Sequence, residues 1–292
     1  MKKTLAMMTA AMMVASALAG CGSSSSTPAA TTAVATEAAT DAATTEAAGD
    51  TAAAAEGSVK TPSGKFTVGF DQEFPPMGFV GDDGQFTGFD LDLAKEVASR
   101  LGLEFVPQPI NWDAKDMELD SGNIDCIWNG FTMQGREDAY TWVGPYMANN
   151  QVFVVNADSD IASKADLAGK AVEVQKDSSG LAALQDDAEL SASFGSMTEV
   201  ADYNTALMDL ESGACDAVCL DSIVAGYQIK SSGKDMKILD DTLSAEEYGI
   251  GFKKGEDELA KAVYDTLMEM KDDGTVAKIS NDWFGSDVFT LK

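Results

Sequence analysis

Polar and aromatic side chains follow the apolar, strand-like runs of this sequence. Ligands of open α/β sheets bind beyond the carboxyl ends of the strands, so residues at these points are candidates for a binding site. The rule selects Asp71, Phe74, Trp112, Asn129, Gly130, Thr132, Arg136, Ser178, Ser179 and Asp221. Together they offer a guanidinium, hydroxyl groups, carboxylates and aromatic rings, which suits the binding of a small polar molecule.

Several kinds of catalytic or metal site are excluded by composition. The chain has no histidine, so Ser-His and Cys-His nucleophiles and histidine-containing metal sites are absent. Cys126, Cys215 and Cys219 remain besides Cys21, and Cys126 and Cys219 stand in apolar runs. Buried free thiols are therefore expected, with a disulfide from Cys215 left open. No cofactor and no metal are expected.

The charge balance restricts the partners. Acidic residues outnumber basic ones 48 to 20, for a net charge of −28. Such a chain is expected not to bind nucleic acid, whose phosphates require basic side chains. It is also repelled by anionic lipid.

The elements that position the candidates alternate between strand and helix, which predicts parallel sheets flanked by helices. Asp90 is expected to cap a helix whose apolar face ends at Leu101, with Gly102 stopping it. The other main elements are expected as strands at 65–70, 103–106, 124–128, 151–155, 171–175 and 216–220, and as helices at 180–186, 205–211 and 259–270.

An internal echo indicates two similar lobes. Residues 117–130 read MELDSGNIDCIWNG and residues 208–221 read MDLESGACDAVCLD, which suggests one helix-turn-strand unit used twice. Asp125 and Asp216 occupy equivalent positions and are interpreted as structural. We expect lobe I to comprise residues 61–153 and 247–292 and lobe II residues 154–246, with crossings near 150–155 and 247–250.

The N-terminus has the features of an exported protein. Two lysines precede an apolar run that Leu18-Ala-Gly-Cys21 closes, so residues 1–20 are predicted to be a signal peptide. The ending resembles a bacterial lipobox, which implies that Cys21 is lipidated; an ordinary cleaved signal with an incidental cysteine is the alternative. The Ser, Thr, Ala and acidic composition of residues 21–60 predicts a disordered linker. The protein is expected to be lipid-anchored on the outer face of the cell membrane.

The ordered motifs together resemble the bacterial extracellular solute-binding proteins of family 3, the polar-amino-acid-binding proteins of ABC importers. Their marks are DQEFPPM at 71–77, GFDLDL at 88–93, residues 125–132 with Arg136, residues 175–179 and residues 216–221. The resemblance implies a two-lobed periplasmic-binding-protein-like fold of type II with a two-crossing hinge. It also implies a monomer that delivers its ligand to a membrane permease and ATPase.

The resemblance further implies a role for each candidate. Arg136 holds the ligand α-carboxylate, assisted by the Gly130 N–H, by Thr132 and by the turn at Ser178 and Ser179. Asp221 accepts the α-ammonium. Phe74 and Trp112 lie on either side of the apolar part of the ligand, and Asp71 contacts its side chain. A surface ion pair of Arg136 with Glu137 or Asp138, and helix capping by one of the serines, are the alternatives. Asp177 replaces a usual glycine and disfavours an anionic side chain.

Two other functions stay open on sequence alone. A dehydratase of cyclic acids can use the same scaffold, with Glu73 or Asp71 as the acid or base. A surface adhesin is the third possibility. Asp71, together with Glu73 if it faces the site, favours a cationic or amide side chain on the ligand.

Overall fold

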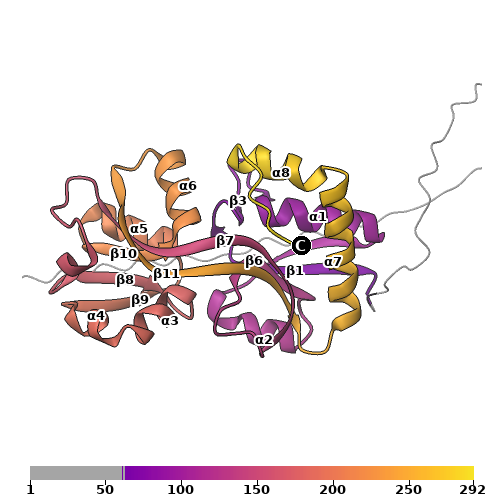
Figure 1. Cartoon of the computed structure of the whole chain (residues 1–292), viewed down its shortest axis with the longest axis horizontal. Coiled ribbons are helices and arrows are strands. Elements are labelled where there is room, and N and C mark those ends of the chain that lie inside the picture. Colours follow the sequence, from indigo (N-terminus) through magenta and orange to yellow (C-terminus); the bar gives the residue numbers. More distant parts are fainter. Residues whose placement is uncertain (1–60, 62) are drawn as a thin grey trace, which may run out of the picture. The chain divides into compact units, whose positions relative to one another are not determined.

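Figure 1 shows a computed structural model, in which residue 61 and residues 63–292 are described. The predicted signal peptide, the lipidated Cys21 and the linker lie outside these residues. Within the described part, no helix is long and apolar enough to span a membrane. The described residues form two α/β lobes joined by two long strands.

Lobe I contains the N-terminal elements and the last two helices. They are β1 (Lys65–Phe70), β2 (Glu73–Phe74), β3 (Gly78–Val80), β4 (Phe86–Thr87), α1 (Phe89–Leu101), β5 (Glu104–Pro109), a 3-10 turn (Trp112–Ala114), α2 (Lys115–Asp120), β6 (Cys126–Thr132), α7 (Asp257–Asp272) and α8 (Thr275–Phe284). Strand β1 pairs in parallel with β5 and β6. Helices α1, α7 and α8 pack together beside this sheet.

Lobe II contains the middle of the chain. Its elements are a 3-10 turn (Lys164–Leu167), β8 (Ala171–Gln175), α3 (Ser179–Asp186), α4 (Ala188–Ser193), β9 (Ser196–Val200), α5 (Tyr203–Ser212), β10 (Ala217–Asp221) and α6 (Ser222–Ser232). Strand β8 pairs in parallel with β9 and β10.

The two lobes share β7 (Tyr140–Asn156) and β11 (Met236–Lys253), which run side by side between them (Figure 1). These strands pair antiparallel, from Met236 opposite Asn156 to Lys253 opposite Tyr140. They join both lobe sheets into the order β5-β1-β6-β11-β7-β10-β8-β9. The parallel pairing expected from the sequence therefore holds in each lobe, whereas the crossing strands are antiparallel to their neighbours. The expected lobe boundaries fall within β7 and β11.

The first helix begins differently from the sequence-based expectation. Helix α1 has Gly88 at its N-cap position, without a side-chain cap, and ends before Gly102. The expectation that Asp90 caps this helix is wrong: Asp90 is its second residue and is fully buried. Its carboxylate accepts hydrogen bonds from the Gly130 N–H (2.7 Å) and the Tyr146 hydroxyl (2.8 Å) instead.

The internal echo of the sequence is a repeated structural unit. A helix ends, a glycine with positive φ reverses the chain (Gly122, φ 76°; Gly213, φ 78°), and a buried strand follows. Just before each strand, an aspartate accepts the N–H of a neighbouring strand: Asp125 from Thr67 (2.6 Å) and Asp216 from Ala171 (2.8 Å). The structural role expected for both aspartates is confirmed.

The apolar cores follow the predicted faces. The largest cluster surrounds β1 and α1, includes Val152 and Val154 of β7, and continues into lobe II. A second cluster lies in lobe II around Phe153, Val172 and Val174. Cys126, Cys215 and Cys219 are free and buried, so the expectation of buried thiols is confirmed and Cys215 forms no disulfide in the described chain.

Candidate functional site

A pocket lies between the two lobes. Its space of about 280 Å³ is partly continuous with solvent, and about 10 Å³ of it has room for a water-sized molecule. Nine of the ten candidate residues line it: Phe74, Trp112, Asn129, Gly130, Thr132, Arg136, Ser178, Ser179 and Asp221. Lobe I supplies the first six and lobe II the last three. The rule that strand ends form the site therefore brings together residues that are up to 147 positions apart in sequence.

Strand β6 forms one wall of this cavity with its last residues. All seven residues of β6 are buried, so the chain ends this strand inside the protein. Gly130 has a φ of 57°, and a Cβ there would lie 2.9 Å from the Phe74 ring, so only glycine fits without displacement. In this structure the Gly130 N–H donates to Asp90, and its use for a ligand carboxylate stays a prediction.

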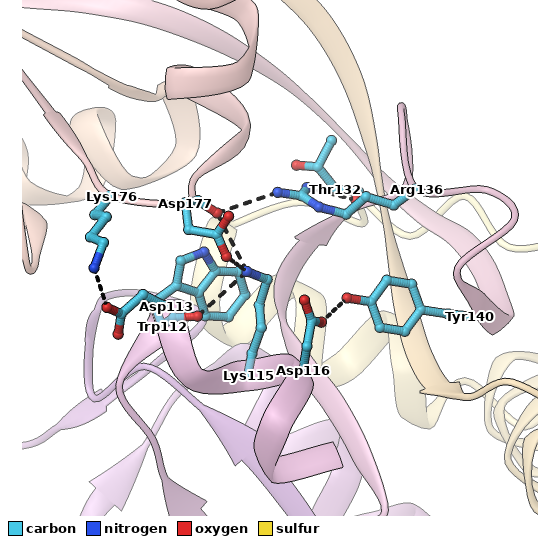
Figure 2. Close-up of polar contacts among 9 residues, drawn as sticks. All are labelled: Trp112, Asp113, Lys115, Asp116, Thr132, Arg136, Tyr140, Lys176 and Asp177. Atoms are coloured by element: carbon cyan, nitrogen blue, oxygen red, sulfur yellow. Dashed lines mark hydrogen bonds and ion pairs between the residues drawn. The ribbon is translucent and has the colours of Figure 1, made fainter. Parts of the chain in front are cut away.

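Arg136 extends from the turn after β6 toward lobe II (Figure 2). Its guanidinium donates to the Thr132 carbonyl (3.2 Å) and to the Asp177 carbonyl of lobe II (3.4 Å), and lies 5.2 Å from the centroid of the Phe131 ring. None of the ion pairs in the described chain involves Arg136, so the alternative of a pair with Glu137 or Asp138 is not what the structure has. A cation without a carboxylate partner at the cavity wall can bind an anion.

The serine pair begins helix α3 on the lobe II side. Ser178 is the N-cap, and its hydroxyl accepts the Leu181 N–H (3.1 Å), as the capping alternative proposed. The Ser179 hydroxyl accepts from the Thr132 hydroxyl (3.1 Å) and from Gln151 Nε2 (3.1 Å). Ser179 therefore connects lobe I, lobe II and the crossing strand β7 at the cavity.

Asp221 lines the cavity from lobe II, as the last residue of β10. Its side chain is 3% exposed and accepts hydrogen bonds from Asn149 Nδ2 (2.7 Å) and the Tyr248 hydroxyl (2.6 Å). Burial and the neighbouring Glu246 carboxyl raise the pKa of Asp221 well above its ordinary value. A cation entering the cavity would remove this penalty, because an opposite charge favours the ionised carboxyl.

Asp71 lies beside the cavity instead of lining it. Its carboxylate accepts Gln175 Nε2 (2.6 Å), and its backbone N–H donates to Asn129 Oδ1 (3.0 Å). Burial raises the pKa of Asp71 to about 6. It also lines an adjoining interlobe groove whose carboxylates are those of Asp71, Glu73, Asp113, Glu118, Glu199 and Asp202, against one lysine, Lys176.

Glu73, considered above as a catalytic group, also lines that groove. Its carboxylate accepts a hydrogen bond from Asn204 of lobe II. The condition that Glu73 faces the interlobe space is therefore met, although the residue does not line the pocket that holds the other candidates.

Two ion pairs of opposite polarity join the lobes next to Arg136 (Figure 2). The buried Lys115 of lobe I, 2% exposed, pairs with Asp177 of lobe II. Lys176 of lobe II pairs with Asp113 of lobe I at 2.7 Å, with both side chains largely in solvent. Asp177 stands where a glycine was expected and has a φ of 57°. Its negative charge, expected near the ligand carboxylate, is paired with the positive charge of Lys115.

Two cavity residues were missed by the sequence reasoning. Gln175 is the last residue of β8 and stands within a motif that was recognised, but its amide was not selected as a contact. Tyr203 begins α5, and its ring lies 5.8 Å from that of Phe74, across the lobes. A tyrosine at the start of a helix has no sequence signal that separates a cavity wall from a core position.

The predicted aromatic sandwich is only partly assembled by the structure. Phe74 faces Tyr203, whereas Trp112 packs edge-to-face against Phe131 (5.6 Å).

In the described residues, no group of three or more Cys, Asp or Glu side chains is placed to hold a metal ion.

Comparison with known proteins decides the family. The sequence profile of the bacterial extracellular solute-binding proteins, family 3, matches residues 66–286. The chain belongs to this family. The family resemblance found in the sequence is therefore confirmed over nearly all of the two lobes.

Individual family 3 relatives cover the same region. The L-cystine-binding protein of Escherichia coli K12 is 32% identical over 231 residues, which are 77% of this chain and 84% of that protein. The arginine-binding extracellular protein of Bacillus subtilis is 30% identical over 75% of this chain and 86% of its own length. Both are named as binding proteins and not as enzymes.

A solved family member confirms the two-lobed fold. The substrate-binding protein of an ABC uptake transporter from Streptococcus pneumoniae, solved with bound histidine, has a TM-score of 0.76 and is 34% identical to this chain. The match covers 78% of this chain and 95% of that one.

Proposed function

We propose that this protein is the substrate-binding component of an amino-acid ABC importer and that it captures a polar amino acid by both charges of its head. One observation carries the proposal: the interlobe pocket has the Arg136 guanidinium on lobe I and the buried Asp221 carboxyl on lobe II. Arg136 is assigned to the α-carboxylate and Asp221 to the α-ammonium. Thr132 and Ser179 are assigned to the remaining carboxylate contacts.

Selectivity follows from burial. A charge removed from water is costly unless it is paired, so only a ligand with both charges in the right order compensates both lobes. Micromolar affinity corresponds to about −8 kcal/mol, which two charge-assisted contacts and aromatic burial can supply. Phe74, Trp112 and Tyr203 are assigned to the apolar part of the ligand.

The ligand side chain is assigned to the Asp71 end of the site. Asp71 adjoins the cavity through Gln175 and opens to the acid-lined groove. A cationic or amide side chain suits this surface, and an acidic one is disfavoured by like charge. The named ligands of the relatives, cystine, arginine and histidine, define a first panel.

Export and anchoring complete the proposal. Residues 1–20 direct export, Cys21 is lipidated, and the monomer is held near a permease and ATPase that receive the closed form. Several acyl chains would hold it firmly, at about 0.8 kcal/mol per buried CH₂. Replacing Cys21 by Ser should release the protein from the membrane fraction into the medium or periplasm; continued retention by the membrane would contradict lipidation.

Calorimetric titration tests the binding site. L-cystine, L-arginine, L-histidine and L-glutamine are titrated into the wild type, Arg136→Ala and Asp221→Asn. Binding of at least one of them is expected, with loss in both variants. Arg100→Ala is the matched control, because Arg100 is the other arginine of the chain and pairs with Glu96 and Asp273 away from the cavity. Unchanged affinity in Arg136→Ala would overturn its assignment.

A further inference from the structure

The crossing strands bring a second buried carboxyl, Glu246, up to Asp221. Glu246 lies in β11, is 5% exposed, and was not among the residues selected from the sequence. We infer that Glu246 tunes the ammonium site: Asp221 and Glu246, the carboxyl pair, share one proton in the free protein and release it when a ligand ammonium binds. The release step rests on the proposed function, whereas the shared proton does not.

The geometry of the carboxyl pair is fixed by one amide. Asn149 Nδ2 donates one hydrogen bond to Asp221 Oδ1 (2.7 Å) and one to Glu246 Oε1 (2.6 Å). The orientation of this amide is settled by its oxygen, which accepts from the Ser222 hydroxyl (3.1 Å) and the Ile223 N–H (3.3 Å). Both hydrogens of the amide are therefore used, and the two carboxyl groups converge on a single nitrogen.

The other groups around the carboxyl pair are neutral. Gln151 Nε2 of β7 donates to Glu246 Oε1 (2.9 Å), and the Tyr248 hydroxyl of β11 donates to Asp221 Oδ1 (2.6 Å). Tyr203 of α5 and Cys219 of β10 lie near enough to be affected by the charge of Asp221, and burial raises the pKa of both. Neither carboxyl takes part in any ion pair of the described residues.

Two carboxylates cannot both ionise in such a place. Like charges that share a buried site raise the pKa of one partner strongly, and the two groups titrate as a pair. Glu246 both repels a charge on Asp221 and accepts a hydrogen bond from its protonated form. Burial and the Glu246 carboxyl therefore favour the protonated form of Asp221 in the free protein.

Ligand binding exchanges one cation for another. The ligand ammonium arrives with its own three protons and one positive charge, Asp221 loses its proton to solvent, and the site then holds two carboxylates and one ammonium. No covalent bond changes. Glu246→Gln would leave Asp221 without its repelling neighbour, so Asp221 would be more fully ionised before the ligand arrives. Fewer protons would then be released per ligand bound.

The first experiment needs no ligand. Carboxyl ¹³C NMR of protein labelled at Asp and Glu follows the titration of Asp221, whose signal is identified by its loss in Asp221→Asn. We expect the Asp221 signal to titrate well above the usual range of aspartate and to move to lower pH in Glu246→Gln. Glu247→Gln is the matched control, because Glu247 is the adjacent, exposed residue. An ordinary titration of Asp221 in the wild type, or no movement in Glu246→Gln, would overturn the inference.

The second experiment counts protons in the unmodified protein. Binding enthalpy is measured in buffers of different ionisation enthalpy at about pH 7.5, above the pKa of Asp71, with the tightest of L-cystine, L-arginine and L-glutamine. L-histidine is omitted because its imidazole titrates itself. A release of about one proton per ligand is expected. Binding without release overturns the exchange alone, whereas absence of binding by the whole panel, with Asp221 still titrating high, overturns the proposed function alone.

Discussion

The backbone amide of Gly130 donates a 2.7 Å hydrogen bond to the carboxylate of Asp90, at the wall of the ligand cavity. Asp90 also accepts the Tyr146 hydroxyl, so one buried acid ties α1, β6 and β7 together. The conformation of Gly130, with its positive φ and its close approach to Phe74, is therefore held by a fully buried residue that does not line the cavity.

Asp90 should make the stability of the protein depend on pH. Burial raises the pKa of Asp90 to about 7 from an ordinary value of 3.8, so the folded state binds its proton more tightly than the unfolded state does. The free energy of unfolding should then fall as pH rises from about 4 to about 7, by up to a few kcal/mol from this group, and level off above that. Urea unfolding at several pH values measures it.

Asp90→Asn isolates this contribution, since its amide oxygen can still accept the Gly130 N–H. The stability of the variant relative to the wild type should increase with pH across the same interval. The exposed Asp82→Asn serves as the comparison. Parallel pH profiles of Asp90→Asn and the wild type would show that Asp90 titrates normally.

The two interlobe ion pairs should differ in their effect on ligand affinity. Asp177→Asn leaves the buried Lys115 without its carboxylate in the closed form, so binding should weaken roughly tenfold, about 1.4 kcal/mol. Asp113→Asn removes the exposed pair with Lys176 and should change affinity less than about twofold. Calorimetry on both variants provides the comparison, and equal effects would rule out Lys115–Asp177 as the dominant contact.

Asp71 should affect which ligand side chain is bound, and not how the α-carboxylate and α-ammonium of the ligand are bound. Asp71→Asn removes a carboxylate that adjoins the cavity through Gln175, so affinity for L-arginine should drop about tenfold relative to that for L-glutamine. Discrimination should also fade in the wild type as pH is lowered through about 6, where Asp71 gains its proton. Equal losses for both ligands in Asp71→Asn would place the side chain elsewhere.

Much of the site was predictable because it depends on a local rule. Nine candidate residues follow from the position of strand ends, and the repeated unit with Asp125 and Asp216 is visible in the sequence itself. The errors arise where tertiary partners decide. Asp90 has the sequence position of a helix N-cap, yet its carboxylate is buried and accepts hydrogen bonds from Gly130 and Tyr146. Glu246 is followed in the sequence by a second glutamate, Glu247, which is exposed. Only the pairing of β7 with β11 decides which of the two glutamates is buried.

The repeated unit has a consequence for the orientation of the ligand. The two copies end at equivalent positions, Gly130 in one lobe and Asp221 in the other, and both residues line the cavity. Two similar halves facing each other would receive a molecule equally well in either direction. One of the differences at matched positions, a residue without a side chain against a carboxyl group, helps to break that symmetry, together with Arg136 in lobe I. On the proposed function, the polarity of the bound molecule thus depends in part on divergence within a duplicated unit.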